Sequence, residues 1–175
     1  MEKATSFLIA YAQAFKDVGA NGIIITEPAA GLLSPLMCAS FSFEYIKKIV
    51  DAVQDDHFMV ILHNCGNTKK LVTSLLSTGA MGFHFGNAIS MLDILPQIPW
   101  GRIAFGNIDP VSIKNDTPEE IRNKVWDLLT KTAIYKNFVL STGCDVPPGT
   151  TLDKMDIFFQ TLEQFNSSIL KQHTA

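Results

Sequence analysis

The stretch FMVILHNCGNT (residues 58–68) joins a short apolar run to a group of polar residues. A short run that is apolar at every position predicts a β-strand buried on both faces, as in a parallel sheet. Gly66 follows directly and indicates a turn. His63 and Cys65 therefore lie at the carboxyl end of the expected strand. They either bind something there or belong to an ordinary turn.

Similar apolar runs recur along the chain, with helical stretches between them. The further expected strands are 22–26, 82–85, 103–105 and 138–141. Phe7, Tyr11 and Phe15 share one face of a first helix that ends at Gly19. Thr117 opens a capping box with proline at the first helical position, which predicts a helix start. The later expected helices are 43–53, 69–76, 89–95, 118–136 and 152–170, with fraying after 170.

Each of the five expected strands is followed by a helix. This alternation predicts an α/β domain with a parallel sheet and right-handed crossovers, spanning 1–175 as a single domain. The Phe-Gly-Asn sequence ends two strands, at 85–87 and 105–107, and equal units of this kind suit a barrel. A five-stranded doubly wound sheet is the alternative. The Gly-rich dinucleotide fingerprint is absent.

Composition excludes several classes of function. The chain has 175 residues, is 47% hydrophobic and carries a net charge of -3 without a basic block, which argues against a nucleic-acid partner. No apolar run approaches the ~20 residues of a membrane span, and the first residues lack a signal-peptide pattern, so we expect a cytoplasmic protein without a membrane partner. Three cysteines argue against a disulfide framework.

Polar residues gather where the expected strands end. They are Glu27, His63, Cys65, His84, Asn87, Asn107, Asp109, Cys144 and Asp145. Because the site of α/β barrels and open α/β sheets lies at the carboxyl ends of the strands, these residues are the site candidates. For Asp109, which precedes proline, an Asx-type turn is an equal alternative, and for His84 a core histidine is.

Three of these residues suit zinc. His63, Cys65 and Cys144 offer one imidazole and two thiolates, which leaves a fourth position for a substrate. The spacing of two places His63 and Cys65 on the same side of an extended strand end. Cys144 follows a strand of its own, and we expect a neighbouring strand, ~4.8 Å away, to bring it close. Core thiols beside a satisfied histidine are the alternative, which is also how we interpret Cys38.

Several stretches resemble a known family. ITEPAAGLLSP (25–35), LHNCGNT (62–68) and LSTGCDVPPGTTLDKM (140–155) resemble the uroporphyrinogen decarboxylase superfamily, and within it the cobalamin-dependent methyltransferases that pass methyl groups between corrinoids and thiols. HFGNAISM (84–91) and FGNIDP (105–110) are similar to the same family. The resemblance implies a partial TIM-type (β/α)8 barrel. It covers the C-terminal portion of family members roughly twice this length, so about three strands are missing.

The resemblance also implies a chemistry. His63, Cys65 and Cys144 match the family's His-x-Cys…Cys zinc motif, and the methyl group would travel on a corrinoid (cobalamin) carried by a partner protein. Glu27 and His84 are our candidates for the fourth ligand. We expect catalytic roles for Glu27, His84 and Asp145, and binding of a small-molecule substrate by Asn87, Asn107 and Asp109.

Two other functions stay open. One is decarboxylation of uroporphyrinogen to coproporphyrinogen in porphyrin biosynthesis, which the resemblance implies to be metal-free and to need arginines. The chain has only Arg102 and Arg122. The other is an inactive fragment or subunit that self-associates or needs an N-terminal half, because an incomplete barrel leaves two unpaired edges.

Overall fold

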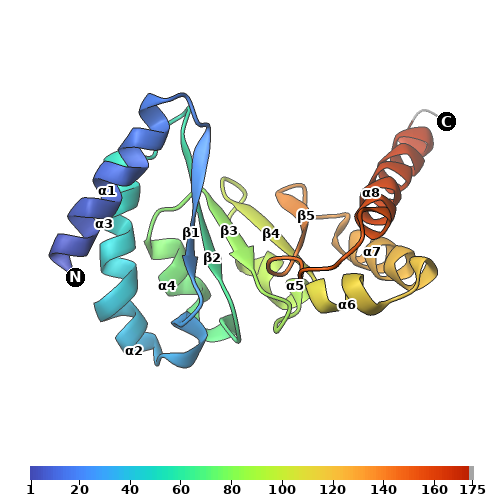
Figure 1. Ribbon diagram of the computed structural model, residues 1–175, viewed down its shortest axis with the longest axis horizontal. Coiled ribbons are helices and arrows are strands. Elements are labelled where there is room, and N and C mark those ends of the chain that lie inside the picture. Colours follow the sequence, from blue (N-terminus) through green and yellow to red (C-terminus); the bar gives the residue numbers. More distant parts are fainter. Residues whose placement is uncertain (174–175) are drawn as a thin grey trace.

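Five parallel strands form one sheet in the computed structural model, which describes residues 1–173 (Figure 1). The strands are β1 (Gly22–Glu27), β2 (Met59–Asn64), β3 (Gly82–Phe85), β4 (Ile103–Ile108) and β5 (Phe138–Thr142). Their order in the sheet is β1-β2-β3-β4-β5, so each strand pairs with its neighbour in sequence. A doubly wound sheet would reverse its order at a switch point. The order is instead that of a barrel segment, which confirms the predicted fold class.

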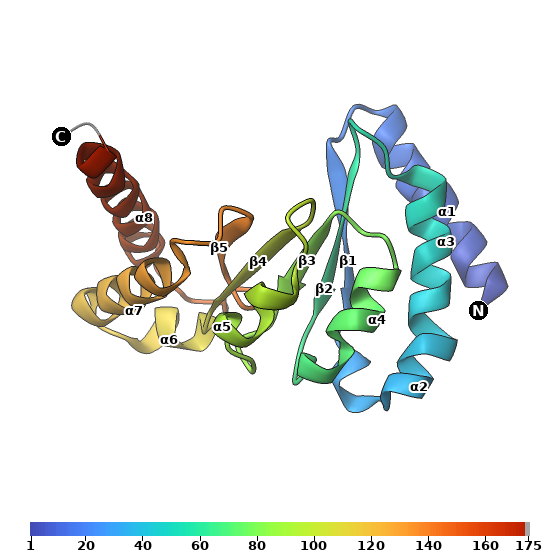
Figure 2. The ribbon, with the colours of Figure 1, turned by 180° about the vertical axis from the view of Figure 1, so that it is seen from behind.

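Helices connect the strands on one side of the sheet. They are α1 (Glu2–Asp17), α2 (Pro35–Cys38), α3 (Glu44–Val53), α4 (Val72–Ser77), α5 (Met91–Ile94), α6 (Pro110–Asn115), α7 (Pro118–Thr132) and α8 (Leu152–His173). Short 3-10 segments lie at Ala30–Leu32, Lys69–Leu71 and Leu95–Gln97, and a π-helical turn at Ala39–Phe43 joins α2 to α3. The pair α1 and α3 lies at one end of the molecule and the pair α7 and α8 at the other, which also separates the two termini (Figures 1 and 2).

The helix boundaries depart from prediction in a few places. The capping box at Thr117 opens α7 as expected, but α7 ends at Thr132 because the chain turns there toward β5. The short helices α2 and α6 were not predicted. The last helix extends past Leu170 to His173, and residues 174–175 lie outside the described part, so fraying after residue 170 stays a prediction. None of the described helices is long and apolar enough to cross a membrane.

The two faces of the sheet differ in burial. The face covered by helices is buried, and Val60, Leu62 and Ala104 on it are fully buried. The other face, called the inner face below, carries a row of side chains that the strand register aligns. This row consists of Thr26, His63, His84, Phe105 and Val139. In a closed barrel this face is a packed interior. Here Ile24 on the same face is 61% exposed and Val139 is 42% exposed.

The predicted apolar face of α1 points away from the core. Phe7, Tyr11 and Phe15 stack along the helix, with ring centroids 6.0 Å and 4.9 Å apart, and are 67%, 54% and 40% exposed. An adjoining side of α1 buries Thr5 and Ala12. The exposed face continues into the unpaired edge of β1, where side chains of both elements line an apolar groove. The periodicity thus predicted the helix correctly, but this face has no partner in the described structure.

Candidate metal centre

His63, Cys65 and Cys144 meet at the carboxyl ends of the strands. His63 lies on β2, Cys65 directly follows β2, and Cys144 follows β5. The Nε2 atom of His63 is 3.1 Å from Cys65 Sγ, which is 3.7 Å from Cys144 Sγ. Nitrogen and both sulfurs lie within 4.8 Å of one another, so together they could hold a metal ion.

The route by which Cys144 arrives differs from our expectation. We expected a neighbouring strand to carry it, but β3 and β4 separate β2 from β5. The loop after β5 instead folds over the ends of these strands. The amide of Gly143 continues the β4–β5 ladder by donating to the carbonyl of Ile108 at 2.7 Å, and Gly143 then lies against the backbone of Asn87, which follows β3. The curved sheet and the loop after β5, rather than direct pairing of β2 with β5, therefore bring the two sulfurs together.

Glycines allow the backbones of these loops to touch. A Cβ atom on Gly143 would lie 2.5 Å from the backbone nitrogen of Asn87, and one on Gly31 would lie 2.7 Å from the carbonyl oxygen of Cys65. Real Cβ contacts are essentially never that short. Gly66 has a φ of +76°, a conformation that glycine adopts without steric cost, and it turns the chain directly after Cys65.

The donor set fits zinc. Two Zn–S bonds of about 2.3 Å at a tetrahedral angle separate their sulfurs by about 3.8 Å. The observed separation of Cys65 and Cys144 is 3.7 Å. His63 is closer to Cys65, at 3.1 Å, than the roughly 3.6 Å of ideal geometry, which a small rotation of the cysteine side chain would correct. Three protein ligands leave one position for an exchangeable group.

A second histidine lies against the first. The Nδ1 atoms of His63 and His84 are 2.5 Å apart, which is a direct hydrogen bond. The other ring nitrogen of His84, Nε2, lies 2.8 Å from the carbonyl oxygen of Thr142 and 3.1 Å from the hydroxyl of Ser141. Both residues belong to β5, so His84 connects the metal-ligand strand β2 with the strand that leads to Cys144.

Burial governs the protonation of the site. It lowers the pKa of His63 and, together with the charge on His63, lowers that of His84. Burial also raises the pKa of the Cys65 thiol, and the neighbouring Cys144 raises it further. Neutral imidazole is the form that binds metals, whereas a thiol must lose its proton first. Metal binding at this site is therefore coupled to release of a proton from Cys65.

The remaining site candidates lie around this group. The carboxylate of Glu27 accepts hydrogen bonds from the Ser42 hydroxyl and, at 3.3 Å, from the side-chain amide of Asn64. It is thus engaged at the end of β1, outside the group of three. The side-chain amide of Asn107 donates to the carbonyls of Gly86 and Ile89, at 3.0 Å and 2.7 Å, and so holds the loop after β3.

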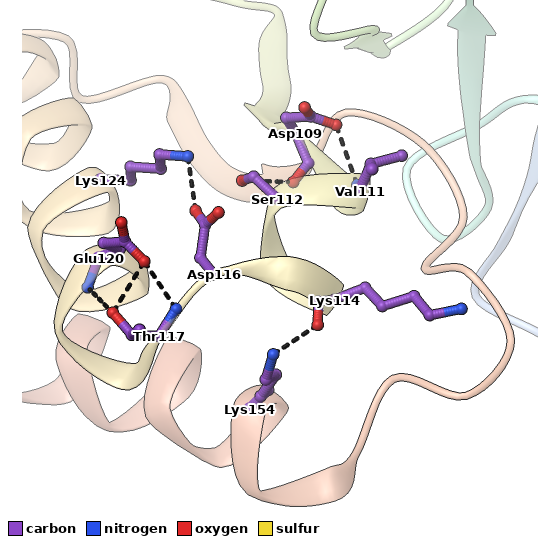
Figure 3. Close-up of polar contacts among 9 residues, drawn as sticks. All are labelled: Asp109, Val111, Ser112, Lys114, Asp116, Thr117, Glu120, Lys124 and Lys154. Atoms are coloured by element: carbon purple, nitrogen blue, oxygen red, sulfur yellow. Dashed lines mark hydrogen bonds and ion pairs between the residues drawn. The ribbon is translucent and has the colours of Figure 1, made fainter.

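Three more candidates are structural or exposed. Asp109 caps α6, with its carboxylate accepting from the amide of Val111 at 2.9 Å (Figure 3). The side chain of Asn87 is exposed, although its backbone contacts Gly143. Asp145 is exposed as well and lines a cavity of about 460 Å³ in front of the inner face, together with His63, His84 and Cys144.

Sequence reasoning missed three residues that support the site. Asn64 and Ser42 hold Glu27, and Thr142 holds both His84 and, through its hydroxyl, the carbonyl of Cys144 at 2.8 Å. The positions of Asn64, between two ligands, and of Thr142, at the end of β5, were available as signals. Ser42 lies in the π-helical turn, and no pattern in the sequence distinguished it. Cys38 is fully buried, which agrees with its interpretation as a core residue.

Comparison with known proteins identifies the family. The sequence profile of uroporphyrinogen decarboxylase (URO-D) matches residues 1–165. The chain belongs to the uroporphyrinogen decarboxylase family. It is 30% identical over 164 residues to methylcobamide:CoM methyltransferase MtbA of Methanosarcina acetivorans, which covers 89% of this chain and 46% of that protein. It is also 31% identical over 147 residues to uroporphyrinogen decarboxylase of Prochlorococcus marinus, covering 83% of this chain and 41% of that protein.

A solved structure agrees on the fold. A methyltransferase from Methanosarcina mazei superimposes with a TM-score of 0.82 at 23% identity, over 93% of this chain and 48% of that structure. The chain spans about half the length of the curated relatives it matches. Methyltransferases and uroporphyrinogen decarboxylases match this chain at similar identity, so overall similarity does not distinguish the two activities.

Proposed function

We propose that this chain supplies the zinc centre of an enzyme that transfers a methyl group between a corrinoid on a partner protein and a small substrate such as a thiol. The observation that carries the proposal is the approach of Cys65 Sγ to within 3.7 Å of Cys144 Sγ, beside the Nε2 atom of His63. Methylcobamide and CoM appear in the names of the MtbA relatives, and the resemblance in the three long motifs points to the same branch of the family.

His63, Cys65 and Cys144 would hold the metal. When bound, zinc supplies Lewis-acid activation, which keeps a substrate thiol in its nucleophilic thiolate form at neutral pH. The residues of the chain provide the surroundings. The inner-face cavity admits a small molecule, and the side chains of Ile61 and Phe105 give it apolar walls. Asp145 at its rim is placed to orient a substrate.

The enzyme also needs the rest of a barrel. The exposed inner face, the open edges of β1 and β5 and the aromatic face of α1 are surfaces that a complete barrel buries. We propose that a polypeptide carrying the remaining βα units covers them, in the cytoplasm, before full activity appears. A chain without that complement would bind metal but transfer methyl groups slowly or not at all.

Uroporphyrinogen decarboxylation has less support from the site. Arg102 precedes β4, at the opposite end of the strand from the site, and its guanidinium contacts the sulfur of Met81 at 3.7 Å. Arg122 lies on α7 and is exposed. No arginine or lysine lines the inner-face cavity in the described structure, whereas the carboxylate of Asp145 does. A substrate with many carboxylates would meet no cation on this face.

Metal analysis tests the proposal. Purified chain should contain about one zinc per molecule, because three protein ligands with one open position are enough to hold catalytic zinc. His63→Ala and Cys144→Ala should lose the metal, and Cys38→Ser, a matched control at the third cysteine, should retain it. Zinc far below one per chain in the parent, unchanged in the variants, would contradict the proposal. So would conversion of uroporphyrinogen to coproporphyrinogen by the metal-free protein.

A further inference from the structure

The hydrogen bonds of His84 determine where its proton lies. A carbonyl oxygen can only accept, so the contact of 2.8 Å between His84 Nε2 and the Thr142 carbonyl requires a proton on Nε2. A neutral imidazole has one N–H and one bare nitrogen, and the bare nitrogen of His84 is therefore Nδ1. Both nitrogens are then occupied, one by Thr142 and one by His63, so neither is left to bind the metal in this arrangement.

The tautomer of His84 determines which ring nitrogen of His63 carries the proton. Its Nδ1 atom lies 2.5 Å from the bare Nδ1 of His84, so the hydrogen bond between them requires His63 to donate from Nδ1. With its proton there, neutral His63 has its lone pair on Nε2. That nitrogen is the one that faces Cys65 Sγ at 3.1 Å and belongs to the group of three. The hydrogen bonds that link Thr142, His84 and His63 thus direct the lone pair of His63 Nε2 toward the metal position.

We propose that His84 is a positioning residue: held by the carbonyl of Thr142, it fixes His63 in the Nδ1–H tautomer and so presents Nε2 to the metal. The inference rests on the metal centre of the proposed function. Free imidazole side chains favour the opposite tautomer, with the proton on Nε2, so an unassisted His63 would have to exchange its proton before binding. Partners that fix the tautomer of a histidine ligand typically contribute strongly to metal affinity.

Thr142 couples this effect to the third ligand. Its carbonyl accepts from His84, while its hydroxyl donates to the carbonyl of Cys144 at 2.8 Å. The register of β5 against β4 pairs Thr142 with Ile108 and fixes both contacts. The orientation of His63 on β2 and the placement of Cys144 after β5 therefore depend on the same residue.

Nitrogen NMR of the unmodified chain tests the tautomer without any substitution. In metal-free protein labelled with ¹⁵N at histidine, two-bond ¹H–¹⁵N correlations should show the proton of His63 on Nδ1 and that of His84 on Nε2. A proton on Nε2 of His63 would overturn the proposal. The measurement does not depend on activity, so it is decided separately from the proposed function.

Zinc affinity of variants provides the second readout, by competition with a chromogenic chelator. His84→Phe keeps the ring but removes both nitrogens, and should weaken zinc binding about 10- to 100-fold. His84→Gln, whose amide offers one acceptor and one donor, should recover most of the loss, which a purely space-filling role would not produce. His57→Phe, at an exposed histidine, is the matched control and should leave affinity unchanged.

Equal affinity of His84→Phe and the parent would overturn the proposal. Absence of methyl transfer in the presence of a polypeptide that supplies the remaining βα units, with zinc bound and the tautomer as stated, would contradict only the proposed function.

Discussion

The sulfur atoms of Cys65 and Cys144 lie 3.7 Å apart, although 79 residues and two intervening strands separate them. Their approach depends on the curvature of the sheet and on backbone contacts between loops, not on a local motif. The centre is therefore sensitive both to the chemistry of its ligands and to the packing of residues that never touch a metal.

Removal of metal should allow the two sulfurs to join. In metal-free chain, a mild oxidant such as diamide should take up the two thiol hydrogens while a Cys65–Cys144 disulfide forms within one chain, because the thiols are already close. Peptide mass spectrometry should find this bond and leave Cys38 reduced, since Cys38 is fully buried. Added zinc should slow the reaction. A bond to Cys38, or between two chains, would contradict the observed geometry.

Gly143→Ala should damage the centre without touching a ligand. The new Cβ would lie 2.5 Å from the backbone nitrogen of Asn87, so the loop leading to Cys144 has to shift. We expect a loss of about 1–3 kcal/mol in the free energy of unfolding, as for other overpacked sites, together with weaker zinc binding. Urea denaturation and chelator competition measure the two effects. Gly101→Ala is the control, because a Cβ there meets nothing within 4 Å. Equal losses in both variants would show that the close contact is not responsible.

The sequence predicted the sheet well because buried parallel strands are continuous apolar runs, and all five fall within the expected ranges or extend them by up to three residues. It also predicted that His63, Cys65 and Cys144 converge, since the strand ends of such folds share one rim. It could not supply the bond between His63 and His84, which depends on strand register. Nor could periodicity reveal that Phe7 and Tyr11 face outward, because an apolar stripe looks the same whether its partner is present or not.

Glu120 should make the stability of the chain depend on pH. Its carboxylate accepts from the backbone amide and the hydroxyl of Thr117, each at 2.8 Å, and these bonds lower the pKa of Glu120 (Figure 3). Because the folded-state pKa lies below the unfolded one, the contribution is complete above the unfolded value. It is lost as the pH falls through the folded value. The difference in the free energy of unfolding between the parent and Glu120→Gln should therefore shrink on acidification.

Glu119 offers the matched control for this experiment. It lies in the same first turn of α7 and carries the same charge, but its side chain makes no hydrogen bond in the described structure. Urea denaturation between neutral and acidic pH should show a smaller pH-dependent difference for Glu119→Gln than for Glu120→Gln. The same pH dependence in both variants would mean that general charge near the helix start, and not the capping box, is responsible.

Charge on the open edge should prevent association. Ile24 lies on β1, the edge strand, and is 61% exposed beside the aromatic face of α1. Because lysine on an edge strand opposes pairing with another strand, Ile24→Lys should reduce both self-association and binding of a polypeptide that carries the missing βα units. Sedimentation velocity measures self-association, and co-purification measures binding of the polypeptide that carries the missing βα units. Trp100→Lys, an exposed position outside the strands, is the control and should leave both unchanged.

Zinc content should stay the same in both variants, because the metal ligands come from β2 and from the loops after β2 and β5. If Ile24→Lys associates as strongly as the parent, the β1 edge is not the surface that the rest of the barrel covers.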